Sequence, residues 1–150
     1  MATLIEHPTK LQFNAPADIL EREAGLRAAA VPVALPIAPA PLAGTWINCD
    51  KTTRGLIKLI IAVTGNTITV HGFGACTPTP CDWKVIAGLP YADNVTASPA
   101  VAFSALYQFG FKQTLITGRL DAGLLLVETF DHFTDGSGRS DYFSRFYMEK

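Results

Sequence analysis

Residues 124–148, LLLVETFDHFTDGSGRSDYFSRFYM, decide the fold class of this 150-residue chain. Two apolar, aromatic-rich runs flank residues 134–139 (TDGSGR), which have the composition of a turn. The stretch therefore predicts a β-hairpin. The hairpin would carry a set of charged or titratable side chains to one end of its sheet: Asp131, His132, Asp135, Arg139 and Asp141.

The rest of residues 44–150 repeats this alternation of short strands and turns. We expect six strands before the hairpin, at 46–49, 55–63, 67–74, 83–91, 101–109 and 111–120. Short strands with turn signals about every 8–12 residues are typical of all-β sandwiches and barrels. We predict an eight-stranded antiparallel up-and-down β-barrel over 44–150, although one long strand bent at Gly110 would leave seven strands.

Residues 1–43 form a separate N-terminal arm in this prediction. Residues 17–30 (ADILEREAGLRAAA) have the apolar spacing of a short helix, with Ile19, Leu20 and Leu26 on one side. Residues 31–43 (VPVALPIAPAPLA) are rich in proline and favour an extended chain. The arm is either a flexible tail, or a segment that packs on a neighbouring subunit or closes one mouth of the barrel.

The charge balance of the chain argues against partners that recognise charge. There are 12 basic and 13 acidic residues, so no electrostatic footprint for nucleic acid or an anionic membrane is visible. Only 17% of the residues are charged and 49% are hydrophobic, whereas about 25% are charged in a typical soluble domain. The excess apolar surface predicts a lined ligand cavity or a subunit interface, and we expect a homo-oligomer.

The sequence also sets expectations for location and cofactors. The first residues, MATLIEHPTK, lack the basic and apolar regions of a secretory signal, and prolines interrupt the apolar run 28–43. We therefore expect a cytoplasmic protein without a membrane helix. The glycine-rich loop 135–139 lacks the lysine and the following helix of a phosphate-binding loop, and we expect no cofactor.

Gly44-Thr45-Trp46, at the start of the first predicted strand, resembles the calycin group of lipocalins and avidin-like barrels. Those families often begin their first strand with Gly-x-Trp, and the indole plugs one end of the barrel. The resemblance implies a closed antiparallel barrel with a ligand cavity inside. The chain lacks the avidin series of biotin-contacting positions and the later lipocalin motifs, so biotin is not implied. Cyclase barrels of the allene oxide cyclase type are architecturally similar.

Three cysteines, an odd number, argue against a disulfide framework. The predicted strand order brings Cys49 to the same barrel end as Cys76 and Cys81. Together with His71 they are ligands of the types that zinc prefers, although C-x4-C is a loose spacing and His71 lies within a strand. A weak zinc site, a Cys76–Cys81 disulfide and free thiols are the three alternatives.

Glu128 and His132 share one face of the seventh predicted strand. If that face lines the barrel interior, the carboxylate and the imidazole form a candidate acid–base couple. If it lies outside, both are solvated surface groups. Lys58 and Lys112 stand in apolar surroundings, and we expect both to reach solvent rather than act inside the barrel.

Arg139 is expected to support the structure through an ion pair rather than to bind a ligand anion. Three carboxylates are its predicted partners: Asp50, Asp131 and Asp141. Aromatic residues occupy both faces of the last strand, where consecutive side chains such as Tyr142 and Phe143 must point in opposite directions. This pattern predicts apolar contacts both inside and outside the barrel.

Our leading hypothesis is that the barrel binds a small, largely apolar molecule. The predicted ligand contacts are Trp46, Phe73, Tyr107, Phe130, Tyr142 and Arg139. One alternative is a cofactor-independent isomerase or cyclase in which Glu128 and His132 supply acid–base catalysis in the same cavity. A second alternative is a non-catalytic structural or interaction barrel filled by its own side chains.

Overall fold

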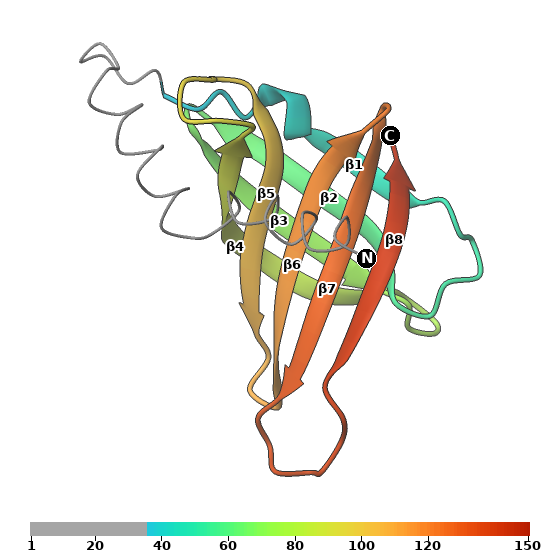
Figure 1. Cartoon of the computed structure of the whole chain (residues 1–150). Helices are drawn as coiled ribbons and strands as arrows, with labels where there is room; N and C mark the ends of the chain where they lie inside the picture. Colours follow the sequence, from blue (N-terminus) through green and yellow to red (C-terminus); the bar gives the residue numbers. More distant parts are fainter. Residues whose placement is uncertain (1–35) are drawn as a thin grey trace, which may run out of the picture. The chain divides into compact units, whose positions relative to one another are not determined.

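The computed structural model of the protein describes residues 36–150, so the predicted helix at 17–30 and the first part of the proline-rich segment, 31–35, lie outside the described residues. A short 3-10 helix precedes eight strands, and each strand pairs antiparallel with the next in a closed barrel (Figure 1). The predicted fold class is confirmed. The elements are η2 (Ala40–Leu42), β1 (Gly44–Asn48), β2 (Leu56–Thr64), β3 (Thr67–Gly74), β4 (Cys81–Ala92), β5 (Ala100–Gln108), β6 (Lys112–Asp121), β7 (Leu124–Phe133) and β8 (Tyr142–Glu149).

Gly110 separates β5 from β6, which settles the strand count. Its φ of +88° lies in the left-handed region that favours glycine. The backbone N–H of Phe109 donates to the carbonyl of Lys112 at 2.9 Å and closes the turn. The chain therefore reverses here, the barrel has eight strands, and the seven-stranded alternative is wrong.

Every second side chain of each strand points to the inner face of the barrel. On β7, Leu125, Val127, Thr129 and Asp131 are buried, while Phe130 between the last two is 45% exposed. Leu125 and Val127 belong to one core cluster with the inward apolar side chains of the other strands. Asp131 is therefore a charged residue on the same inner face as the core.

Trp46 closes the barrel at the end where β1 begins. Its side chain is 2% exposed, and the indole Nε1 donates to the carbonyl of Leu42 in η2 at 2.9 Å. The ammonium of Lys150 lies 4.9 Å from the centre of the indole ring. The tryptophan of the Gly44-Thr45-Trp46 motif thus packs inside the barrel, where the resemblance to calycins places it.

Candidate functional site

Glu128 and His132 lie on the outer wall of the barrel, so the second of the two alternatives for this face is the one observed. Arg145 Nη2 donates to Glu128 Oε2 at 3.1 Å. His132 Nδ1 lies 2.7 Å from Asp141 Oδ2, and this hydrogen bond is the main cause that lowers the pKa of Asp141. Each residue therefore has its own partner from β8 or the preceding loop. A catalytic role for either one stays a prediction.

Lys112 points into the barrel, which corrects the expectation that it reaches solvent. Its ammonium lies 2.7 Å from Asp131 Oδ1, and the two side chains are only 15% and 4% exposed. Thr114 Oγ1 donates to the same carboxylate oxygen at 2.6 Å. The three residues come from neighbouring strands, since Thr114 pairs with Asp131 in the β6–β7 register. The result is a buried ion pair on the inner face.

Aromatic rings surround this ion pair. The Lys112 ammonium lies 5.6 Å from the ring centre of Phe109 and 5.9 Å from those of Phe111 and Tyr142. Phe111 and Tyr142 are 44% and 49% exposed, so solvent reaches the rings that flank the buried ammonium. We call the set Phe109, Phe111, Lys112, Asp131 and Tyr142 the aromatic mouth. It is at the end that carries the β5–β6 and β7–β8 connections, where β6 begins and β7 ends (Figure 1).

Arg139 reaches this same end of the barrel but has a different partner from the three predicted. Its guanidinium pairs with Asp135 at 2.6 Å, and it lies 4.2 Å from the ring centre of Phe133 and 5.6 Å from that of Phe111. Hydrogen bonds from Ser137, and then from Arg139, lower the pKa of Asp135 to about 2. The structural role predicted for Arg139 therefore holds with Asp135 as its carboxylate, and a ligand contact stays a prediction.

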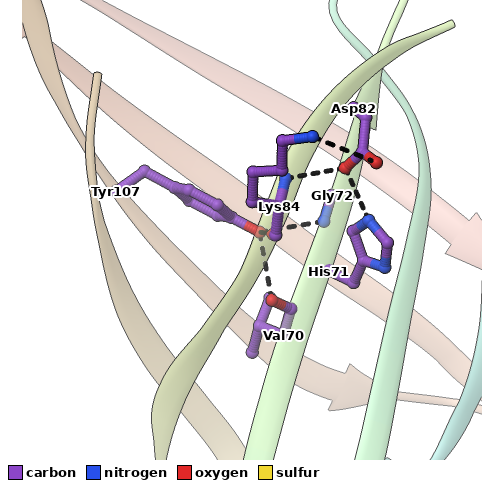
Figure 2. A network of polar contacts seen from close by, with 6 residues as sticks. All are labelled: Val70, His71, Gly72, Asp82, Lys84 and Tyr107. Carbon is purple, nitrogen blue, oxygen red and sulfur yellow. Dashed lines mark hydrogen bonds and ion pairs between the residues drawn. The ribbon is translucent and has the colours of Figure 1, made fainter. Parts of the chain in front are cut away.

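Tyr107 reaches across the barrel and inserts its hydroxyl into an irregular part of the β3–β4 ladder (Figure 2). The hydroxyl accepts a hydrogen bond from the N–H of Gly72 at 2.9 Å, and its own proton can go to the carbonyl of Lys84 at 2.9 Å or of Val70 at 3.1 Å. Lys84 has a φ of +72°, a conformation that side-chain-bearing residues seldom adopt. The pairing of β3 with β4 shifts register between His71 and Phe73. The Tyr107 hydroxyl supplies hydrogen bonds to the backbone of Gly72 and Lys84 at this irregularity.

Burial raises the pKa of Tyr107 to about 12, and this predicts how stability depends on pH. The unfolded state, with a tyrosine pKa of about 10, loses its proton first. The contribution of Tyr107 is therefore complete below pH 10 and falls as the pH rises towards 12. We expect Tyr107→Phe to lower the free energy of unfolding by about 1–3 kcal/mol at pH 7, because the N–H of Gly72 loses its acceptor.

Urea unfolding at pH 7, 9 and 11 measures this effect. The difference between the wild-type protein and Tyr107→Phe should narrow between pH 9 and pH 11, because only the wild type carries the Tyr107 hydroxyl. Tyr91→Phe, which removes an exposed hydroxyl that bonds Ser104, is the matched control and should leave the pH dependence unchanged. A difference that stays constant up to pH 11 would contradict the buried network.

The other predicted ligand contacts divide between the two faces of the barrel. Trp46 and Tyr107 are buried inside, and Tyr142 borders the aromatic mouth. Phe73 lies instead on the outer wall, where the Lys58 ammonium is 4.2 Å from its ring centre and its ring is 4.3 Å from that of His71. Phe130 also faces outwards, with its ring centre 5.2 Å from that of Phe143. The structure therefore does not bring the predicted set together around one lumen.

The cysteine loop is closed by a disulfide between Cys76 and Cys81, one of the three alternatives. This bond uses two of the thiolates that the weak zinc candidate would need, so that site is not assembled. Cys49 is free and exposed, and His71 Nε2 pairs with Asp82 Oδ1 at 2.6 Å. Among residues 36–150 no cluster of three histidine, cysteine or acidic side chains is arranged to hold a metal ion.

Comparisons with known proteins found no relative of this chain. No family model, no curated protein and no solved structure matches the chain. Within the described part of the chain, no helix has the length and apolar character needed to cross a membrane. The candidate site therefore rests on the geometry of the barrel itself.

Proposed function

We propose that this barrel binds a small, largely apolar molecule at the aromatic mouth, with the Lys112–Asp131 pair selecting a polar group of that molecule. The observation that supports the proposal is a buried ion pair on the inner face, flanked by aromatic rings that solvent reaches. The end of the lumen near η2 is packed by fully buried side chains such as Trp46 and Phe103. The ligand would therefore lie at the mouth rather than deep in the barrel.

The energetics of the ion pair favour a functional reason for its presence. Removing two charges from water costs several kcal/mol each, and well-packed apolar residues are often as stable as a buried pair. An apolar lumen would not need Lys112 or Asp131 for stability alone. A buried charged pair beside accessible aromatic rings combines the convergent polar groups and the apolar lining of a ligand site.

The donors of Lys112 indicate the chemistry of the ligand. An ammonium carries three N–H donors and no acceptor, and one donor is used by Asp131 at 2.7 Å. The remaining donors lie among the rings of Phe109, Phe111 and Tyr142. A molecule with an aromatic or aliphatic body and one acceptor, such as a carboxylate, sulfonate or carbonyl, matches this arrangement.

Two fluorescent probes that differ by one group test this proposal. N-phenyl-1-naphthylamine is neutral, and 8-anilino-1-naphthalenesulfonate has the same body with an added sulfonate. We expect both to bind, and Phe111→Ala to weaken both because the ring contact is lost. The double variant Lys112→Met/Asp131→Asn should weaken the sulfonate probe about 10-fold or more, and the neutral probe far less, because charged hydrogen bonds contribute about 1.5–3 kcal/mol.

Lys58→Met is the matched control. It removes a lysine that also lies over an aromatic ring, that of Phe73, but on the outer wall. Affinity for both probes should be unchanged in this variant. The proposal is contradicted if neither probe binds, or if Lys58→Met affects the sulfonate probe as much as the double variant does.

The acid–base enzyme has less support from the geometry. Glu128 and His132 lie on the outer wall and pair with Arg145 and Asp141. His132 and Asp141 border a surface hollow of about 340 Å³, which Asp131 and Tyr142 of the aromatic mouth also line. No contact there favours one reaction over another, and binding remains the function that we propose.

A further inference from the structure

A continuous apolar row crosses the outer wall of the barrel. Leu106 on β5 pairs with Leu115 on β6, Leu115 with Phe130 on β7, and Phe130 with Phe143 on β8. These four side chains point outwards and are 47%, 40%, 45% and 50% exposed. We call this row the outer stripe. These directly paired side chains form one contiguous apolar patch on a solvent-facing wall, and such a patch is often functional.

Polar rows border the outer stripe on both sides. In the same registers, Gln108 pairs with Gln113, and Gln113 with His132, on the side towards the β5–β6 turn. The row on the opposite side is polar throughout and consists of Ser104, Thr117, Glu128 and Arg145. An apolar centre with a polar rim is the anatomy of a protein–protein interface.

The outer stripe is the apolar centre of a larger contact surface. Leu89 on β4 pairs with Ser104, and Tyr91 and Tyr147 pair with Ala102 and Leu126, so these three exposed side chains lie in or beyond the polar row. With 150–250 Å² for a large side chain, the four half-exposed residues of the stripe present roughly 350 Å² of apolar surface. A standard interface buries about 800 Å² per partner, and the two polar rows supply the rest of that contact.

The order of residues along the outer stripe identifies the partner that fits it. Two leucines occupy one end, on β5 and β6, and two phenylalanines occupy the other end, on β7 and β8. If two copies meet with their stripes antiparallel, every large ring of one copy lies against a smaller leucine of the other. A two-fold axis midway between Leu115 and Phe130 produces this arrangement for all four residues at once.

The polar row of Ser104, Thr117, Glu128 and Arg145 is compatible with the same two-fold axis. The axis places Glu128 opposite Thr117 of the second copy, and Arg145 opposite Ser104, so no like charges meet. The net charge of −1 per chain adds little repulsion between copies. We propose that the outer stripe is the interface of a two-fold symmetric homodimer, a role that does not depend on ligand binding at the aromatic mouth.

Sedimentation velocity over a dilution series of the full chain tests the interface. We expect a dimer for the wild type at micromolar concentration. Leu115→Arg places one charge in each half of the interface centre and should raise the dimer dissociation constant about 100-fold or more. Thr69→Arg, which adds the same charge to an exposed position on β3, is the matched control and should remain dimeric.

Phe143→Lys, at the other end of the outer stripe, provides a second variant in case Leu115→Arg does not fold, and circular dichroism verifies folding of each. A folded, monomeric stripe variant beside a dimeric Thr69→Arg supports the interface. A wild type that stays monomeric at 100-fold higher concentration overturns it. A dimer that survives in a folded stripe variant also overturns it, because the copies would then meet elsewhere.

Discussion

Lys112→Met is expected to lower the free energy of unfolding by about 3–5 kcal/mol, because it leaves the Asp131 carboxylate buried without its cation. The Asp131 side chain is 4% exposed, and its partner atom in Lys112 is 2.7 Å away. Water cannot replace the ammonium without entering the inner face of the barrel. The loss should therefore exceed that of a surface ion pair, which contributes about 0–1 kcal/mol.

Removal of both charges should restore most of this stability. In Lys112→Met/Asp131→Asn the side chain at position 131 still offers an acceptor to the Thr114 hydroxyl, which donates to the wild-type carboxylate at 2.6 Å. Urea unfolding of the wild type, both single variants and the double variant gives the coupling energy directly. A matched control is Arg145→Met, which breaks the half-exposed pair with Glu128 on the outer wall. If Lys112→Met costs no more than that control, the pair is not buried as described.

Trp46→Ala is expected to lower the free energy of unfolding by about 3–5 kcal/mol, the range for loss of a large buried aromatic side chain. The indole is 2% exposed, and it ties β1 to η2 through its hydrogen bond to the Leu42 carbonyl. Removing the ring leaves a cavity in the closed end of the barrel and leaves that carbonyl without its donor.

Trp46→Phe separates the two contributions to this effect. It retains most of the buried ring but cannot donate a hydrogen bond, so we expect a loss of about 1–3 kcal/mol. Thermal and urea unfolding measure both variants. Equal losses for Trp46→Ala and Trp46→Phe would contradict the packing role of the ring, and no loss in either variant would contradict its position inside the core.

Much of the fold could be predicted because runs of apolar and aromatic residues mark the strands, and residues that favour turns, such as glycine, separate them. The Thr134–Arg139 composition predicted the last hairpin, and Gly110 marked the reversal between β5 and β6. The closed order of eight strands followed from short connections between antiparallel neighbours. The helix predicted at 17–30 lies outside the described residues and stays a prediction.

The site was harder to predict because the sequence does not state which face of a strand is inside. Glu128 and His132 do share a face, but the buried alternation of Leu125, Val127 and Thr129 assigns that face to the outer wall. Lys112 shares its face of β6 with Thr114 and Ile116, which are buried. The sequence places these three residues on one face but does not mark that face as the inner one, because Leu115 makes the opposite face apolar as well.

The second limit on predicting the site was the pairing of side chains within loops. Arg139 had several carboxylates within its expected reach, and it pairs with Asp135, four residues earlier in the same loop. The disulfide between Cys76 and Cys81 was one of three alternatives that the spacing left open. Such choices depend on the path of a loop, which composition does not determine.

The most direct test of ligand binding at the aromatic mouth is a titration of ¹⁵N-labelled full-length protein with N-phenyl-1-naphthylamine, followed by amide chemical shifts. We expect the largest shifts at Phe109, Phe111, Lys112 and Asp131, where the rings and the ion pair of the aromatic mouth lie. Amides near Trp46, at the closed end, should shift little. Shifts confined to the outer stripe around Leu115 and Phe130, or no shifts at saturating probe, would contradict the proposed site.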